Sequence, residues 1–343
     1  MNPPLKEPDS VTQKCQRILE ENGGLIAEKS RSIMLNDPKL AELKEPLEFI
    51  STNWRDPFTP SIIKLSCEAV EGKTTKTEKV SLALSLMHLT FSIWDDVIDK
   101  TTSKSFKPTL FGKYGENMAI IIGGLASAKG FSILEEMDIK REIQKKILDL
   151  VWRLWATMSK AEVNAIRLRT KKSYSSLDKM NKIKMEATDT EICLKIGATL
   201  GNGSGSEIIR LGRYGLFFGI ILGLWHDFRV STNLTLELAE KLRNGRLTYS
   251  LLLACERSEN FRKKLDTLLF KNEFDAVSLK RVVEDMLATG ILEEIEKNIK
   301  VYTKKAKEEL KPIKMNRGSR TLHSLVELQP RFFVESISLL QTR

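Results

Sequence analysis

The chain has 343 residues, of which 41% are hydrophobic and 29% are charged, and its formal net charge is +10. This length and apolar fraction suit one large domain or two ordinary ones and exclude a largely disordered chain. The positive charge suits an anionic partner, but the sequence has no aromatic–basic repeat, so we expect no nucleic-acid binding.

Proline placement and hydrophobic periodicity predict an all-α fold. After Pro108 the chain has no proline until Pro312, as expected for a stack of long helices. Apolar residues in this stretch recur at spacings of three and four, and no segment shows convincing strand alternation. In chain order, the predicted helices cover residues 10–35, 37–51, 59–71, 76–100, 114–136, 139–170, 175–200, 205–229, 234–257, 258–271, 277–310 and 318–341.

No linker, repeat or low-complexity run divides these helices. The glycine-rich segment 201–205 follows no strand and precedes an N-cap pattern, which indicates a helix–helix turn rather than a phosphate-binding loop. We therefore expect one domain over 1–343, a bundle of about 10–12 helices. In this domain, residues 1–50 form an N-terminal helical segment on a core made by 51–343.

The cysteines and the hydropathy bear on location. Cys15, Cys67, Cys193 and Cys255 lie far apart, without metal-ligand spacing or a secretory signal before them, which predicts free thiols in a reducing cytoplasm. Apolar stretches such as 214–225 are too short to cross a bilayer. We expect a cytoplasmic protein whose basic runs allow, at most, peripheral contact with an anionic membrane.

Three aspartates, Asp95, Asp96 and Asp99, end an otherwise apolar predicted helix. Asp95 and Asp99 are one turn apart and share a face, whereas Asp96 lies about 100° around the helix. Such carboxylates repel one another and oppose the helix dipole unless cations neutralise them. An all-oxygen ligand set favours Mg²⁺, which also binds substrate phosphates. The simpler alternative is an exposed acidic helix end, but the apolar run before the cluster favours an apolar pocket with a metal–phosphate site at its mouth.

The segment Asp95-Asp96-Val97-Ile98-Asp99 resembles the first aspartate-rich motif, DDxxD, of the trans-isoprenyl diphosphate synthases, the polyprenyl synthetase family. His88 stands where this family usually has histidine. Further segments resemble family segments in the same order, namely 107–115, 211–224, 243–254 and 320–331. The resemblance covers about residues 50–335, is nearest to an archaeal-type branch, and implies the isoprenoid synthase type I fold with a central apolar cavity and a homodimer.

In this family a prenyl diphosphate binds through Mg²⁺ to two aspartate motifs, ionises to an allylic cation and is attacked by isopentenyl diphosphate. The resemblance implies that Asp95, Asp96 and Asp99 are catalytic, and that Asp95 and Asp99 bind Mg²⁺. The second motif reads 226–230, His-Asp-Phe-Arg-Val, and retains only Asp227. Asp227 is implied as a further ligand and catalytic residue for two or three ions, and the alternative is an ion pair with a nearby base.

The diphosphate-binding cations depart from the family pattern. The acceptor segment GGKR-x-RP corresponds to residues 54–60, the RRG segment to 104–106, and the Lys–Thr pair to 185–186. Because most of these cations are missing, we do not expect isopentenyl diphosphate to bind in the usual place. The cations that remain to hold diphosphate are Lys104, Lys184, Arg246 and Arg55.

Residues before the two acidic motifs are the predicted walls of the pocket. Phe91 lies one turn before Asp95, and Met87 lies a further turn deeper. Phe91 resembles the family position whose bulk sets pocket depth, and an ordinary core aromatic is the alternative. Trp94 and Trp225 are candidates for π contact with a cation, with packing as the simpler interpretation. His88 is expected to be a hydrogen-bonded histidine beside them.

Three functions follow from these patterns. The favoured one is a Mg²⁺-dependent prenyltransferase that acts on an allylic prenyl diphosphate, with the acceptor, chain length and product left open. A terpene cyclase or diphosphate lyase would explain the missing cations, but its N-D-x-x-S-x-x-x-E motif would need polar residues at Val230 and Leu234. A non-catalytic subunit of a prenyl synthase is the third possibility, and it would leave the three aspartates without a use.

Overall fold

The computed structural model describes residues 10–104, 107–169, 175–232, 236–271 and 274–341, and it confirms the all-α fold. A hairpin made of two strands of two residues each, β1 (Ser103–Lys104) and β2 (Lys107–Pro108), was not predicted. Short 3₁₀ helices span Pro38–Leu43 and Thr74–Thr77. The α-helices are α1 (Val11–Ser32), α2 (Lys44–Asn53), α3 (Phe58–Ala69), α4 (Glu78–Asp99), α5 (Leu110–Glu135), α6 (Arg141–Arg169), α7 (Ser176–Glu186), α8 (Thr188–Leu200), α9 (Gly205–Thr232), α10 (Leu236–Arg243), α11 (Tyr249–Arg257), α12 (Glu259–Lys271), α13 (Ala276–Ala288), α14 (Ile291–Leu310) and α15 (Arg317–Gln341).

Three predicted helices are each divided in two. The predicted helix 234–257 is interrupted between α10 and α11, where Gly245 has φ of +64°, and 277–310 is interrupted at Gly290, where φ is +75°. Glycine adopts this left-handed backbone without steric strain, so both positions end helices. The helix predicted over 175–200 is divided at Ala187 into α7 and α8.

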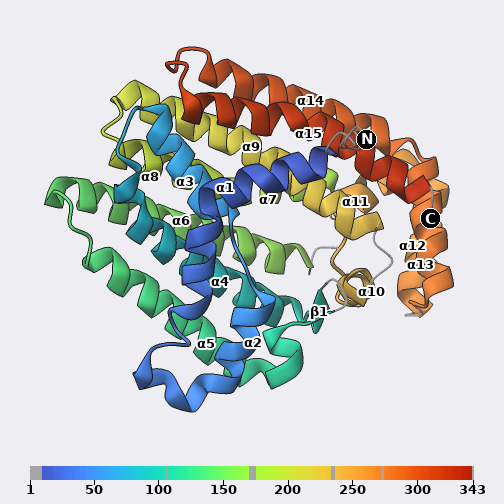
Figure 1. Cartoon of the computed structure of the whole chain (residues 1–343). Helices are drawn as coiled ribbons and strands as arrows, with labels where there is room; N and C mark the ends of the chain where they lie inside the picture. The colour runs from blue at the N-terminus through green and yellow to red at the C-terminus, as the bar shows by residue number, and fades with distance from the viewer. Residues whose placement is uncertain (1–9, 105–106, 170–174, 233–235, 272–273, 342–343) are drawn as a thin grey trace, which may run out of the picture.

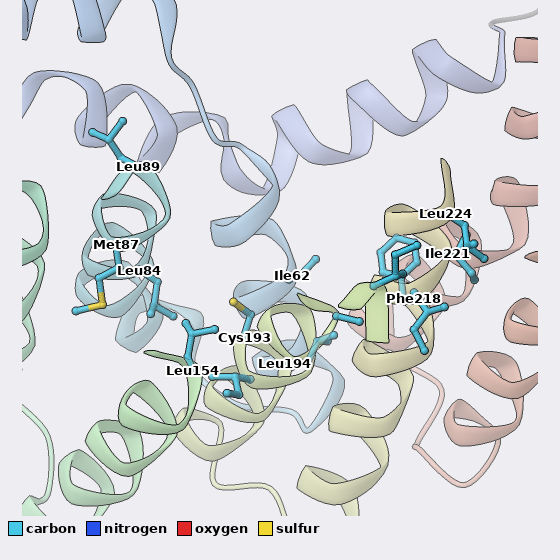
Figure 2. Packing of buried hydrophobic residues seen from close by; sticks show 14 of the residues in the cluster. Ile62, Leu84, Met87, Leu89, Leu154, Cys193, Leu194, Phe218, Ile221 and Leu224 are labelled. Atoms are coloured by element: carbon cyan, nitrogen blue, oxygen red, sulfur yellow. The ribbon is translucent and has the colours of Figure 1, made fainter. Parts of the chain in front are cut away.

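One continuous hydrophobic core joins the helices, from Met34 near the N-terminus to Phe333 in α15. Helix α8 lies at its centre, in contact with α3, α6 and α9, and Figure 2 shows Leu154 of α6 close to Cys193 of α8 and Leu84 of α4. Helices α14 and α15 run side by side across the edge of the bundle in Figure 1. The N-terminal helix α1 packs on α3 and α4.

Helix α4, which ends in the three aspartates, is fixed by its close approach to α5. A Cβ atom on Gly123 would lie 2.4 Å from the indole nitrogen of Trp94, and one on Gly130 would lie 2.9 Å from the carbonyl oxygen of Ala83. The two glycines therefore let α5 lie directly against α4.

Two helices, α5 and α9, are long and apolar enough to cross a membrane by length and composition alone. The expectation that no apolar stretch reaches this length was therefore wrong. In the bundle, however, α9 packs against α8 and α14, and α5 packs along α4. Both helices thus supply walls of the core.

Candidate functional site

The three aspartates occupy the last turns of α4. The helix stops after Asp99 because Lys100 adopts a left-handed backbone with φ of 53°, and the N–H of Thr101 then donates to the carbonyl oxygen of Asp96 at 2.9 Å. The side chains of Asp96 and Asp99 are buried, whereas that of Asp95 is 40% exposed. The predicted cluster therefore points into the protein rather than forming an exposed acidic end.

Cations from other elements face these carboxylates. Lys104 of β1 places Nζ 2.5 Å from Oδ1 of Asp96 and 3.8 Å from Oδ2 of Asp95. Asp99 contacts Arg246, in the loop before α11, and Lys241 of α10 at 3.6 Å. These pairs explain how acidic groups are tolerated at a helix C-terminus.

The pKa directions of the two adjacent aspartates differ. Burial raises the pKa of Asp96 to about 6, although Lys104 opposes the shift. Burial acts on Asp95 in the same direction, but Lys104, Lys182 and Lys241 together outweigh it, so the pKa of Asp95 is lowered. Asp95 therefore stays ionised more readily than Asp96, as a metal ligand requires.

A polar cavity of about 130 Å³ opens beside the cluster, between α4, α7, α9 and α10. Its walls carry both acidic and basic side chains, so it suits an anionic ligand accompanied by metal ions. It is lined by Asp95, Asp99, Ala165, Lys179, Lys182, Glu186, His226, Asp227, Val230, Lys241, Gly245, Arg246, Leu247 and Thr248.

The carboxylate of Asp227 holds the start of α11. It accepts hydrogen bonds from the backbone N–H groups of Tyr249 (3.0 Å) and Ser250 (3.1 Å) and from the hydroxyl of Ser250 (3.2 Å). Lys179 of α7 lies 3.9 Å away. Asp227 thus combines a capping role, which the sequence did not predict, with a place in the wall of the polar cavity.

His226 lies where the polar cavity meets a second, largely apolar cavity of about 390 Å³. Burial first, and then the nearby cations, lower the pKa of His226 to about 3, so the imidazole is neutral. The apolar cavity shares Asp95, Glu186 and His226 with the polar one and is otherwise lined by Phe91, Ser92, Trp94, Ile98, Lys104, Trp155, Met158, Ser159, Ala161 and Glu162. The two compartments therefore adjoin at the acidic end of α4.

Aromatic rings pack along the apolar cavity. The ring centroids of Phe91 and Trp155 are 4.6 Å apart, and those of Trp94 and Trp155 are 6.0 Å apart. Phe91 and Trp94 therefore lie where the sequence predicted them, and Trp155 of α6 is an addition. The cavity can take an extended hydrocarbon and keep water from it.

The structure also contains an all-oxygen group of possible metal ligands. One carboxylate oxygen each from Asp95, Asp99 and Glu162 lies within 4.8 Å of the others. This donor set fits Mg²⁺, which takes carboxylate oxygens and completes its octahedral shell with water or phosphate. Glu162 of α6 was not predicted, because an acidic residue inside a long amphipathic helix carries no signal of its own.

Two predicted diphosphate ligands lie elsewhere. Lys184 is exposed and is not among the residues that line the polar cavity. Lys182 and Lys179 occupy that place, because residues two apart point to opposite sides of a helix whereas residues three apart share a face. Arg55 contacts Glu20 and Glu28 of α1 instead of the cavity. The predictions for Lys104 and Arg246 agree with the cavity walls.

Three predicted pocket residues line neither of these two cavities. Met87 is fully buried in the core between α4 and α5 (Figure 2). Trp225 packs its ring against Phe332 of α15 at 4.8 Å, the packing role that was the simpler alternative. His88 lies in a buried hydrogen-bonded cluster, as expected for a core histidine. Ser105, Phe106 and Leu234 lie outside the described residues.

The sequence is similar to those of known proteins. The Polyprenyl synthetase family model matches residues 43–286. A short chain isoprenyl diphosphate synthase from Methanothermobacter thermautotrophicus is 26% identical over 259 residues, which cover 74% of this chain and 79% of that protein. A heterodimeric geranylgeranyl pyrophosphate synthase large subunit 2 from Arabidopsis thaliana is 26% identical over 222 residues, which cover 60% of this chain and 58% of that protein.

Solved structures share the fold. A polyprenyl synthase from Caulobacter crescentus complexed with calcium and isoprenyl diphosphate superposes with a TM-score of 0.81 at 18% identity, over 95% of this chain and 99% of that one. A geranylgeranyl pyrophosphate synthetase from Pyrococcus horikoshii gives a TM-score of 0.80 at 18% identity, over 92% and 99%. The family model spans more than half of the sequence, and the chain therefore belongs to the polyprenyl synthetase family and is a prenyltransferase-type enzyme.

Proposed function

We propose that this enzyme binds an allylic prenyl diphosphate with Mg²⁺, ionises it beside Asp95, Asp96 and Asp99, and transfers the prenyl group to an acceptor. The observation that carries this proposal is the junction of two compartments at Asp95. One compartment is polar and charged, as a diphosphate with its metal ions requires, and the other is apolar and lined by aromatic rings, as a prenyl chain requires.

Asp95, Asp99 and Glu162 would hold Mg²⁺, with Asp227 as a further ligand from the opposite wall. When bound, two or three such ions neutralise the charge that develops on the leaving diphosphate. The relative from Caulobacter crescentus was crystallised with calcium and isoprenyl diphosphate, which supports a divalent ion in this one as well.

Cations that line the two cavities can also bind the substrate. Lys104, Lys241 and Arg246 lie against Asp96 and Asp99, and the same side chains can donate to phosphate oxygens when a substrate is present. Lys182 contacts Glu162 at 3.3 Å and Glu186 at 3.0 Å, so it too is held at the cavity wall. These groups bind and orient the diphosphate, and the rings of Phe91, Trp94 and Trp155 exclude water from the reacting end of the chain.

The direct test is release of diphosphate from a panel of allylic prenyl diphosphates with Mg²⁺, comparing the wild type with Asp95→Asn and Asp285→Asn. Loss of a metal ligand should lower the rate about 10²- to 10⁴-fold, since it removes several kcal/mol of electrostatic stabilisation. Asp285 pairs with Lys264 on another helix, and its variant should keep the wild-type rate. Equal rates in the wild type and Asp95→Asn would contradict the proposal.

The same assay separates the two other functions. A cyclase or lyase would release diphosphate and form a hydrocarbon or an alcohol in which no acceptor is incorporated, and a non-catalytic subunit would release none. One relative is named as the large subunit of a heterodimeric synthase. Asp95 and Asp99 line the polar cavity of this chain, however, which favours a catalytic subunit.

We also propose that the chain forms a homodimer through α5 and α6. Residues of α6 at spacings that share one helix face are apolar yet exposed, and Trp152 among them is 73% exposed. Helix α5 also exposes apolar residues, and the ring of Phe131 among them lies 6.2 Å from that of Trp155 of α6. The proposed dimer surface comprises Ile120, Ile121, Phe131, Leu148, Trp152, Val163 and Ile166. Sedimentation equilibrium should give twice the monomer mass, and Trp152→Glu should shift the protein to monomer.

We also propose that the protein is cytoplasmic and makes peripheral contact with a membrane. All four cysteines are free thiols in the structure, which suits the reducing cytoplasm. Lys300, Lys304, Lys307 and Lys311 border a groove on α14 that also exposes Met315, a surface suited to peripheral contact with anionic lipid. Sedimentation with anionic and neutral vesicles, at low and high salt, tests that contact.

A further inference from the structure

The polar side chains beneath the active site form a buried network around His88. Its imidazole Nε2 lies 2.6 Å from Oδ1 of Asp189 on α8, and its Nδ1 lies 2.7 Å from the hydroxyl of Thr59 and 3.6 Å from a carboxylate oxygen of Asp56. Asp56 also accepts hydrogen bonds from the backbone N–H groups of Phe58 and Thr59, both at 3.1 Å, at the start of α3. His88 is thus held from both sides by carboxylates.

The charges of this network follow from its contacts. Burial alone would lower the pKa of His88, but Asp189 and Asp56 outweigh it and raise the pKa to about 10. One imidazolium therefore stands between two carboxylates, which leaves the network with an excess negative charge at neutral pH. The side chains of His88 and Asp56 are each only 15% exposed, so solvent screens that charge weakly.

The neighbouring arginines are also paired with carboxylates. Arg55 contacts two carboxylates of α1, with Nε 2.7 Å from Glu28 and the guanidinium against Glu20. Arg31 also contacts Glu28, at 3.0 Å. Around the 54–60 segment, the described carboxylates Asp56, Asp189, Glu20 and Glu28 therefore outnumber the cations Arg31, Arg55 and His88.

The place of this network on α4 relates it to the reaction. His88 lies seven residues before Asp95 and on the same face, about 10 Å along the helix axis. A second substrate that approached the prenyl chain from this end of α4 would meet the His88 cation about two turns before Asp95. Because that cation is already paired twice, an approaching diphosphate would have to displace two partly buried carboxylates, and it would meet their repulsion.

We propose that the prenyl acceptor of this enzyme is a nucleophile that carries no phosphate group. This inference rests on the proposed function. The carbon–oxygen bond of the allylic diphosphate breaks with its electron pair on the diphosphate, and an electron pair of the acceptor forms the new bond to the allylic carbon. The proton that the acceptor loses passes to the released diphosphate or to water, so no further reactant is needed.

Binding stoichiometry tests the inference without turnover. The wild type is saturated with Mg²⁺ and an unreactive allylic thiolodiphosphate, and isopentenyl diphosphate is then added in a calorimeter. We expect the thiolodiphosphate to bind at one molecule per chain and isopentenyl diphosphate to give no saturable heat. A second diphosphate bound at one molecule per chain would overturn the inference. Failure of the thiolodiphosphate itself to bind would instead count against the proposed function.

Turnover and a charge variant provide a second test of the inference. Isopentenyl diphosphate should leave the rate of diphosphate release unchanged and should not appear in the product, whereas chain-elongated product would overturn the inference. Asp189→Asn removes one carboxylate from His88 and should make binding of isopentenyl diphosphate measurable, with a Kd at least about tenfold below the limit set by the wild type. The control, Asp37→Asn, removes a carboxylate that pairs with Lys129 and should leave that binding unchanged. If Asp189→Asn does not fold, the wild-type stoichiometry decides.

Discussion

Replacing Asp227 by asparagine tests how far this carboxylate serves the fold. Its side chain is buried and accepts two backbone N–H groups and one hydroxyl at the start of α11. The asparagine oxygen can still accept, but its NH₂ group then faces an N–H donor. A charged hydrogen bond contributes about 1.5–3 kcal/mol, and an unsatisfied buried N–H costs about 1–3 kcal/mol. Because these effects overlap, we expect a loss of about 2–4 kcal/mol.

Thermal unfolding without Mg²⁺ measures this loss, which for 343 residues corresponds to a Tm lower by roughly 3–6 °C. The matched control is Asp95→Asn. Asp95 is partly exposed and adjoins two other aspartates, so its variant should stay within about 0.5 kcal/mol of the wild type. An Asp227→Asn protein that keeps the wild-type Tm but is no longer stabilised by added Mg²⁺ would refute the capping argument and leave Asp227 as a metal ligand alone.

Two further predictions concern the interior of the bundle. His88→Gln leaves the partly buried carboxylates of Asp56 and Asp189 without their cation and should cost about 1.5–3 kcal/mol at neutral pH. Since the folded-state pKa of His88 is raised to about 10, its contribution in the wild type is complete below its unfolded pKa of about 6.5 and is lost as pH rises through 10. Urea unfolding of both proteins at pH 7 and 10 should show this dependence only in the wild type. Phe91→Ala enlarges the apolar cavity and should shift the preferred substrate toward longer prenyl chains, while Phe270→Ala, at a 92% exposed position, should not. An unchanged chain-length profile for Phe91→Ala would mean that the ring only packs against Trp155.

Helical periodicity predicted the elements of the fold well and their divisions poorly. The prediction joined α10 to α11 and α13 to α14 because apolar spacing continues across Gly245 and Gly290. Only the backbone shows the positive φ angles that interrupt these helices. The hairpin of β1 and β2 was missed for a different reason, since two-residue strands have no measurable alternation. That hairpin nevertheless places Lys104 against Asp96.

Site residues could be predicted where their pattern lies within one helix, and could not be predicted where their position depends on packing between helices. Asp95, Asp96 and Asp99 could be found because their spacing is local to one helix. Lys241 and Glu162 could not, because their part in the site depends on how α10 and α6 pack against α4. Lys182 lines the polar cavity and the predicted Lys184 does not, a difference for which the sequence carries a signal. Met180 and Ile183 mark the buried side of α7, and Lys179, Lys182 and Glu186 form a stripe beside it at helical spacing.

The charges of the polar cavity imply that metal ions and diphosphate bind together. Its walls carry the carboxylates of Asp95, Asp99, Glu186 and Asp227 and the cations of Lys179, Lys182, Lys241 and Arg246. Mg²⁺ alone would add positive charge beside four cations, and diphosphate alone would add negative charge beside four carboxylates. Their opposite charges offset each other, so each should strengthen binding of the other. Titration of Mg²⁺ with and without an allylic thiolodiphosphate should show this coupling as at least about a fivefold difference in Kd. Equal affinities would mean that the lysines and Arg246 stay with their carboxylates and do not turn to the substrate.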